Sequence, residues 1–140
     1  ANELGMTCFL AVLDGAECIT LASVEPRHAV ASVAQRPGAR HPVTVGAPGK
    51  AILAQLPIAE WPHEHPASLR ADVDATRSRG YATSHDEVIP TVQSVAVPLS
   101  LRAQRPAAIA VVHVATDLDD AEIAARLRRS ASVIREALDG

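Results

Sequence analysis

The sequence predicts an α+β domain, with a mainly antiparallel sheet of about five to six strands and helices packed against it. The first observation behind this prediction is a pair of apolar runs joined by Asp14-Gly15, which is typical of a hairpin turn. The second is two apolar, β-branched segments that begin at Val92 and Ala107. The third is the helical pattern between and after these strands, at Ala67–Arg79 and near the C-terminus.

The composition fits one folded domain that spans residues 1–140. With 48% hydrophobic residues, a chain of this length buries a core without disulfides or metal ions. Aromatic residues make up only 2%, so Ala, Val, Leu and Ile must fill the interior. The longest apolar runs are too short to span a bilayer, and no signal peptide opens the chain. We therefore expect a soluble, cytoplasmic domain with no membrane partner.

The charge pattern argues against direct contact with nucleic acid. The formal net charge is −3, and Lys50 is the only lysine. The single local basic cluster is formed by Arg126, Arg128 and Arg129. Domains that bind nucleic acid usually carry a clear basic footprint, so we do not expect this chain to bind DNA itself.

The opening hairpin is predicted to pair Met6–Leu13 with Glu17–Val24. A tight two-residue turn would set Cys8 opposite Leu21 and leave Cys8 and Cys18 on different faces of the sheet. A longer turn would change that register. Two cysteines are too few for a disulfide framework, so we expect both to be reduced packing residues.

Prolines and glycines divide the middle of the chain into short segments. In order, we expect a strand, a loop, a short strand, a helix, a connector and a second helix, at His28–Ala34, Arg36–Pro42, Val43–Ala47, Lys50–Leu56, Pro57–Pro66 and Ala67–Arg79. The second helix is predicted to end at Gly80, because a glycine after a helix commonly takes a left-handed conformation.

A polar connector follows Gly80 and leads into the buried strand that begins at Val92. The connector contains Ser84, Asp86 and Glu87. It therefore places polar groups beside a core strand, which is where a small-molecule site is expected.

The last strand is predicted at Ala107–Ala115, and an amphipathic helix is predicted to run from a cap at Asp119 to about Leu138. The apolar residues of this helix recur every three or four positions, at Ile123, Leu127, Ala131, Ile134 and Leu138. This spacing predicts one face packed on the sheet and an opposite face in solvent.

The loop Gly46–Lys50 (Gly-Ala-Pro-Gly-Lys) does not meet the pattern of a nucleotide-binding P-loop. That pattern needs glycine where this chain has Thr44, and Ser or Thr where it has Ala51. What remains is a small-residue loop that opens a helix, where free N–H groups offer a place for a small carboxylate. A plain tight turn into a helix is the simpler interpretation of the same segment.

Two histidine-containing stretches lack the spacing of reactive sites. Neighbouring residues such as His63–His65 rarely converge on one metal ion without a further ligand pair. Ser84–Asp86 holds the residue types of a catalytic triad, but direct neighbours cannot form its relay and no GxSxG elbow is present. We therefore expect no metal, no cofactor and no catalysis. His113 is either a strand histidine satisfied by a hydrogen bond or a donor that lines a pocket near Ser94.

Two segments resemble the IclR family of transcription regulators. His41–Ala54 (His-Pro-Val-Thr-Val-Gly-Ala-Pro-Gly-Lys-Ala-Ile-Leu-Ala) resembles the Pro-Leu-His-x-Thr-x-x-Gly-Lys-Ala-x-Leu-Ala segment of that family. Arg79–Pro98 begins with Arg-Gly-Tyr-Ala and ends with Val-Gln-Ser-Val-Ala-Val-Pro. It resembles the family's Arg-Gly-Tyr-Ala…Glu-Glu…Gly-Val-x-Cys-Val-Ala-x-Pro run. The opening hairpin fits as well, so the likeness spans nearly the whole chain.

The resemblance implies the C-terminal effector-binding domain of such a regulator. This domain is a GAF-like sheet with helices that reads a small metabolite, often an organic acid or an aromatic degradation product. Nothing in this chain matches the family's N-terminal winged helix-turn-helix. The resemblance thus implies contact with DNA only through that separate domain, and self-association as a homodimer or homotetramer.

The resemblance also implies where the effector binds. Carried over by position, the ligand-binding residues are Gly46, Ala47, Pro48, Gly49, Ser84, Ser94 and, depending on the length of the turn Arg102–Pro106, either Ala110 and Val112 or Val111 and His113.

Several positions depart from the family pattern. The family's His, Thr or Ser, Asp, Gly and Cys are replaced here by Thr44, Gly46, Ser84, Thr91 and Ser94. These replacements make the predicted cleft less polar and less acidic than usual. We therefore expect an organic acid with apolar surface, whose carboxylate is held where the helix begins at Gly49.

The leading prediction is a ligand-sensing regulatory domain without catalysis. One alternative is an oligomerisation domain whose pocket has degenerated, since fold does not fix function. The other is a small hydrolase or isomerase that uses Ser84, Asp86, Glu87 and His113. The sequence shows no activated nucleophile or base for such an enzyme.

Overall fold

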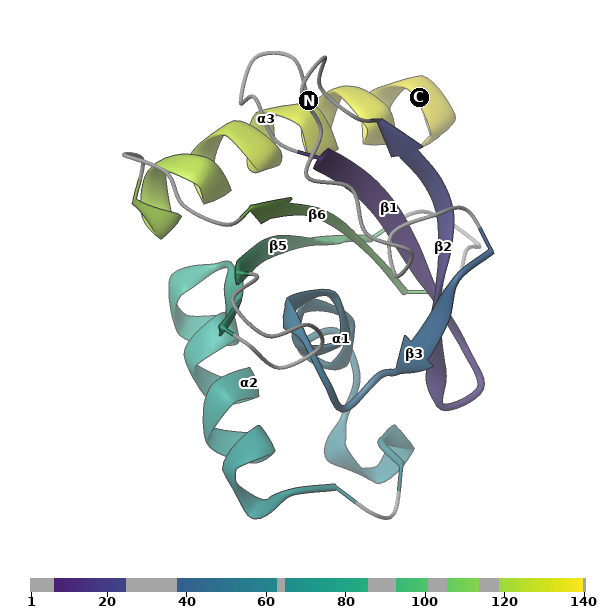
Figure 1. The fold of residues 1–140 in the computed structure, drawn as a ribbon, viewed down its shortest axis with the longest axis vertical. Coiled ribbons are helices and arrows are strands. Elements are labelled where there is room, and N and C mark those ends of the chain that lie inside the picture. Colours follow the sequence, from purple (N-terminus) through teal and green to yellow (C-terminus); the bar gives the residue numbers. More distant parts are fainter. Residues whose placement is uncertain are drawn as a thin grey trace.

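A curled, six-stranded antiparallel sheet forms the centre of the computed structural model (Figure 1). The structure describes residues 7–24, 38–62, 65–85, 93–100, 106–113 and 119–139. The strands lie in the order β3-β2-β1-β6-β5-β4, and each pair of neighbours is antiparallel. Their bounds are Thr7–Asp14 (β1), Glu17–Val24 (β2), Arg40–Pro42 (β3), Ala82–His85 (β4), Gln93–Leu99 (β5) and Ala107–His113 (β6). This architecture confirms the predicted α+β fold.

Helices cover the two faces of the sheet. The short helix α1 (Ala47–Leu53) lies on the concave side, within the curve of the strands, and α2 (Ala67–Arg79) lies beside it (Figure 1). The long helix α3 (Asp120–Asp139) lies on the opposite face. Within the described part of the chain, no helix is both long and apolar enough to cross a membrane.

Successive side chains of each strand point to opposite faces of the sheet, so the domain has two cores, one on each face. On β5, Val95, Val97 and Leu99 pack with α3, whereas Ala96 packs with α1. The strands contribute mainly alanines to the core around α1, namely Ala11, Ala82, Ala96, Ala108 and Ala110, whereas its larger side chains include Phe9, Ile52, Leu53, Trp61 and Leu69. The strands contribute larger side chains to the core under α3, which includes Val95, Val97, Leu99, Ile109, Val111, Ile123 and Leu127. Small side chains on the concave face let α1 lie close to the strands.

The register that a tight turn at Asp14-Gly15 would give, with Cys8 opposite Leu21, does not form. The turn at Gly15–Ala16 pairs Asp14 with Glu17, and a bulge between Leu10 and Ala11 shifts the ladder, so Cys8 pairs with Val24. The bulge leaves Leu21 without a direct partner on β1, and its side chain is 52% exposed.

The two cysteines lie on different faces, which is one of the two arrangements left open by the sequence. Cys18 belongs to the core around α1, whereas Cys8 packs on the core under α3. Both thiols are free.

The prediction for the segment before α1 also needs correction. β3 forms at Arg40–Pro42, within the predicted loop, and Val43–Gly46 is a turn where a short strand was expected. The helix begins at Ala47 instead of Lys50 and ends at Leu53. The proline at its second position, Pro48, loses nothing there, because the first N–H groups of a helix have no partner inside it.

β4 (Ala82–His85) is a strand where the polar connector was expected. It has only four residues, and its polar side chains gave no strand pattern. Pairing with β5 supplies its hydrogen bonds. The second half of the predicted connector, residues 86–92, lies outside the described residues.

The two long helices agree with the prediction. α2 spans Ala67–Arg79, and Gly80 follows in the left-handed conformation with φ of 89°. α3 begins at Asp120, where Asp119 Oδ1 accepts a hydrogen bond from the Glu122 backbone N–H at 2.8 Å. The strand expected at His28–Ala34 and residues 114–115 of the last strand lie outside the described residues.

Candidate functional site

The sheet brings three of the predicted site residues into one row on its concave face. Ser84 on β4 pairs directly with Ser94 on β5, and Ser94 pairs with Val112 on β6. The side chains of directly paired residues lie on the same face of a sheet. Ser84 is 5% exposed and Ser94 is 9% exposed. Two hydroxyls thus lie side by side in a largely apolar interior.

A row of alanines lies next to the two serines. Ala82, Ala96 and Ala110 pair in sequence across β4, β5 and β6, and all three are fully buried in the core around α1. Ala47 and Ala51 of α1 belong to the same core. The wall beside the serines is therefore smooth and apolar.

The structure shows which residues of β6 lie on the same face as the two serines. Ala110 and Val112 lie in the core around α1, together with Ala82 and Ala96, whereas Val111 packs under α3. Of His113, the structure describes the backbone, which pairs with Gln93. Of the two sets left open by the sequence, it is Ala110 and Val112 that share the face of the serines.

The segment predicted as a loop, the Gly46–Gly49 loop, forms the cap and first turn of α1, and it is buried and tightly packed. Gly46, Ala47, Pro48 and Gly49 are all buried, and Gly46 has φ of 89°, which favours glycine. A Cβ built on Gly49 would overlap the carbonyl oxygen of Val43 and lie 2.7 Å from the carbonyl carbon. The position accepts only glycine without movement of the turn.

Lys50 lies next to the candidate site and was not among the predicted site residues. Its side chain is 7% exposed, its Nζ donates a hydrogen bond to the carbonyl oxygen of Thr83 at 3.2 Å, and Nζ lies 3.5 Å from Oδ2 of Asp72. A buried ammonium group needs such partners. Lys50 thus joins α1 to α2 and to β4, and brings a positive charge close to the backbone before Ser84. The signal available was that the only lysine follows the glycine of a predicted tight turn.

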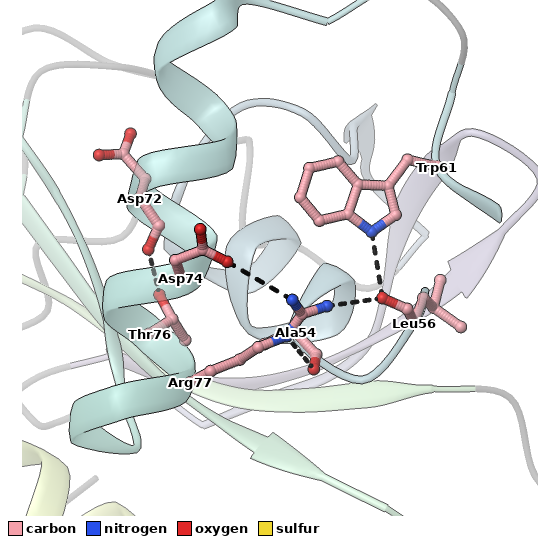
Figure 2. Close-up of polar contacts among 7 residues, drawn as sticks. All are labelled: Ala54, Leu56, Trp61, Asp72, Asp74, Thr76 and Arg77. Atoms are coloured by element: carbon pink, nitrogen blue, oxygen red, sulfur yellow. Dashed lines mark hydrogen bonds and ion pairs between the residues drawn. The ribbon is translucent and has the colours of Figure 1, made fainter. Parts of the chain in front are cut away.

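Contacts with α2 hold the other end of α1 (Figure 2). The guanidinium group of Arg77 donates to the carbonyl oxygens of Ala54 at 3.1 Å and Leu56 at 2.7 Å. Trp61 Nε1 donates to the Leu56 oxygen at 3.3 Å, and Asp74 lies 3.5 Å from Arg77. These donors satisfy carbonyl groups that a helix end leaves free.

The chemistry that this row offers is hydrogen bonding and apolar contact. Ser84 lies in the serine row, and His85 follows it on β4, where its backbone pairs with Gln93, whereas residue 86 lies outside the described residues. Among the described residues, no three His, Cys, Asp or Glu side chains gather as metal ligands. His65, from the other histidine stretch, lies with Nδ1 2.9 Å from the Pro62 oxygen and its ring against Trp61.

The fold belongs to a known class of domain. A curled antiparallel sheet around a short helix is shared with the C-terminal domains of bacterial transcription regulators, as the following comparisons show. Residues 62–136, more than half of the chain, match the family model described as the bacterial transcriptional regulator IclR C-terminal domain. The chain belongs to this family, as the two segments in the sequence suggested. No protein of curated function is significantly similar to it.

Solved structures agree with this assignment. The chain is similar to IclR from Thermotoga maritima, with 25% identity and a TM-score of 0.83 over 99% of this chain and 63% of that one. It is similar to the repressor BlcR from Agobacterium tumefaciens, with 22% identity and a TM-score of 0.82 over 98% of this chain and 62% of that one. The chain therefore spans less than two thirds of these regulators.

An isolated domain gives a further match. The inducer-binding domain of the PobR transcription factor from Acinetobacter was solved as a double mutant in complex with 3-hydroxybenzoic acid. It is 20% identical to this chain, with a TM-score of 0.78 over 95% of this chain and 89% of that one. At this identity the match bears on the fold.

Proposed function

We propose that this chain is the ligand-sensing domain of an IclR-type regulator. It binds a small organic acid with apolar surface on the concave face of the sheet, between the Gly46–Gly49 loop and the row of Ser84, Ser94 and Val112. The observation that carries the proposal is the pair of neighbouring serine hydroxyls, buried among alanines beside a tightly packed loop. Binding sites typically combine an apolar lining with a few convergent polar groups.

The polar groups on this face suit a carboxylate. Serine hydroxyls donate hydrogen bonds to carboxylate oxygens. The Lys50 ammonium, which is paired with Asp72, binds the carbonyl oxygen of Thr83, one residue before Ser84. Ala82, Ala96 and Ala110 offer no hydrogen-bonding side chain to the rest of the ligand. The acid that fits best therefore has an apolar body, such as an aromatic ring or a branched aliphatic chain.

Helix α1 is the element that transmits ligand binding to the oligomer and to the attached DNA-binding domain. This helix is fixed to α2 by Arg77 and Lys50, and to β6 by Gln55, whose Nε2 donates to the Ala107 oxygen at 2.8 Å. A ligand that tightens the Gly46–Gly49 loop would shift α1 and α2 together. We propose that this shift changes the packing of a homo-oligomer and the geometry of an attached winged helix-turn-helix domain. The ligand must bind the two arrangements with different affinity.

A thermal-shift screen tests the proposal. The purified domain is heated with benzoate, 3-hydroxybenzoate, a branched aliphatic acid, a terpenoid acid and glyoxylate, each over a range of concentrations. A ligand that binds only the folded state at about 100 times its Kd adds about 2.7 kcal/mol of stability. For a domain of this size, that corresponds to a Tm increase on the order of 10 °C. We expect a saturable increase with acids that carry apolar surface and none with glyoxylate.

Matched variants locate the binding. Ser94→Trp should fill the space beside the serine row and weaken binding by about 100-fold or more, whereas Ser130→Trp, at an exposed position on α3, should leave it unchanged. Binding of hydrophilic acids alone would contradict the apolar site. A stable dimer whose Tm responds to no compound would favour an oligomerisation domain with a degenerate pocket.

A further inference from the structure

A second group of polar side chains lies on the concave face, at the edge of the sheet away from the serine row. Thr20 on β2 is 1% exposed, and its Oγ1 is buried. His41 on β3 has both ring nitrogens buried. In the part of the chain that the structure describes, none of these three atoms has a hydrogen-bond partner.

The ladder places these side chains on the same face of the sheet. Thr20 pairs with Ala11, and Cys18 pairs with both Leu13 and His41. Ala11 and Cys18 belong to the core around α1. Because paired residues share a face and β2 is extended between Cys18 and Thr20, the side chains of Thr20 and His41 are also directed to that side.

Buried polar side chains without a hydrogen-bond partner are uncommon in native proteins. Buried polar atoms nearly always have a hydrogen-bond partner, and an unpaired one destabilises the fold. His41 lies directly opposite Cys18, so Thr20, two residues further along β2, is its diagonal neighbour. Diagonal neighbours lie about 7–8 Å apart, a separation that one small polar group between the two side chains can bridge. Their burial fits a role that is completed by a bound molecule.

The charge states of the His41 and Thr20 side chains indicate which kind of chemical group they bind. Burial lowers the pKa of His41, although the carboxylate of Glu17 acts in the opposite direction. A neutral imidazole has one donor nitrogen and one acceptor nitrogen, and the Thr20 hydroxyl can do both. The neighbouring Cys18 thiol stays protonated, because burial raises its pKa to about 12. An uncharged group that both donates and accepts matches this environment, whereas a carboxylate lacks the donor.

We propose that Thr20 and His41 form a second ligand-binding point, which holds the uncharged hydroxyl group of a small molecule at the β2–β3 edge of the concave face. The proposal rests on the proposed sensing function, since it assigns a further polar contact to the same face. It predicts that the domain distinguishes hydroxylated compounds from analogues of the same shape that lack the hydroxyl.

Phenol and fluorobenzene are the probes that test this, because they are similar in size and only phenol donates a hydrogen bond. In NMR titrations of the wild-type domain, we expect phenol to bind at least about 10-fold more tightly, since a site built to hydrogen-bond a hydroxyl rejects the analogue without one. The ring nitrogens of His41 should shift with phenol and not with fluorobenzene. Equal binding of the two probes would overturn the proposal.

Variants separate this site from its surroundings. Thr20→Val and His41→Phe should each reduce the preference for phenol to about threefold or less and leave fluorobenzene binding unchanged. Ser130→Val, at an exposed position on α3, should keep the full preference. Retention of the preference in both Thr20→Val and His41→Phe would place the hydroxyl elsewhere and overturn the proposal.

Thermal stability provides a check that does not depend on binding. If Thr20 Oγ1 is unpaired in the free domain, Thr20→Val should have a Tm equal to or above that of the wild type. A clear fall in Tm would show that the hydroxyl already has a partner, and would overturn the proposal. The acid screen on the same protein tests the proposed sensing function separately from the hydroxyl site, because acids can bind at the serine row whether or not phenol is preferred over fluorobenzene.

Discussion

Replacing Gly49 with alanine is expected to destabilise the domain by about 4 kcal/mol, or to prevent it from folding. An added Cβ would occupy the place of the Val43 carbonyl oxygen, which belongs to the backbone and cannot rotate away. The turn Val43–Gly46 and helix α1 would have to separate. Since α1 packs against β4 and β5, which carry Ser84 and Ser94, the same separation would disrupt the proposed ligand site. Urea denaturation measures the loss of stability.

Gly38→Ala is the matched control for this change. Gly38 has φ of 88°, and a Cβ built on it meets no atom within 4 Å. The substitution therefore adds only left-handed backbone strain, about 1–2 kcal/mol. If Gly49→Ala proved no more destabilising than Gly38→Ala, the close packing of the turn against α1 would be contradicted.

The stability of the domain is expected to fall by about 4 kcal/mol between pH 9 and pH 12 because of Cys18. Its side chain is fully buried in the core around α1, and this burial raises its pKa from 9.0 to about 12. Between these two values the unfolded chain loses the thiol proton while the folded domain keeps it. The stabilising contribution is thus complete below pH 9 and is lost as the pH rises, at about 1.4 kcal/mol per pH unit.

Cys18→Val isolates this effect. Valine is similar in size and has no ionisable group, so every other titrating residue contributes equally in the two proteins. The free energy of unfolding, measured by urea denaturation at pH 8, 9.5 and 11, should fall less steeply in the variant. Parallel curves for the two proteins would mean that the thiol is not kept protonated by burial.

The parts of the fold that could be predicted are those whose signals are local. The opening hairpin (although its turn is at Gly15–Ala16, one residue later than predicted), the bounds of α2 with Gly80 behind it, and the capped start of α3 each depend on residues within a few positions of one another. The two edge strands depend on distant partners instead. β3 and β4 have three and four residues and little apolar pattern, so only their pairing with β2 and β5 defines them.

The candidate site could be predicted in part. Ser84 and Ser94 were found through the family resemblance, and the structure shows that they are direct partners. The choice between the two faces of β6 needed the register of the sheet. Thr20 and His41 gave no signal in the sequence, because burial and the lack of a hydrogen-bond partner are properties of the folded chain. The only signal for Lys50 was its place after the glycine of a predicted tight turn, and its burial and its partners needed the structure.

The central claim is that the concave face beside the serine row binds the effector, and a mapping experiment by NMR tests it most directly. ¹⁵N-labelled domain is titrated with the acids of the thermal-shift screen while backbone amide signals are followed. The account predicts that the signals that shift belong to the Gly46–Gly49 loop, Ser84, Ser94 and Ala110–Val112, with α3 residues such as Arg129 unmoved. Saturable shifts confined to α3, or no saturable shift with any acid, would contradict it.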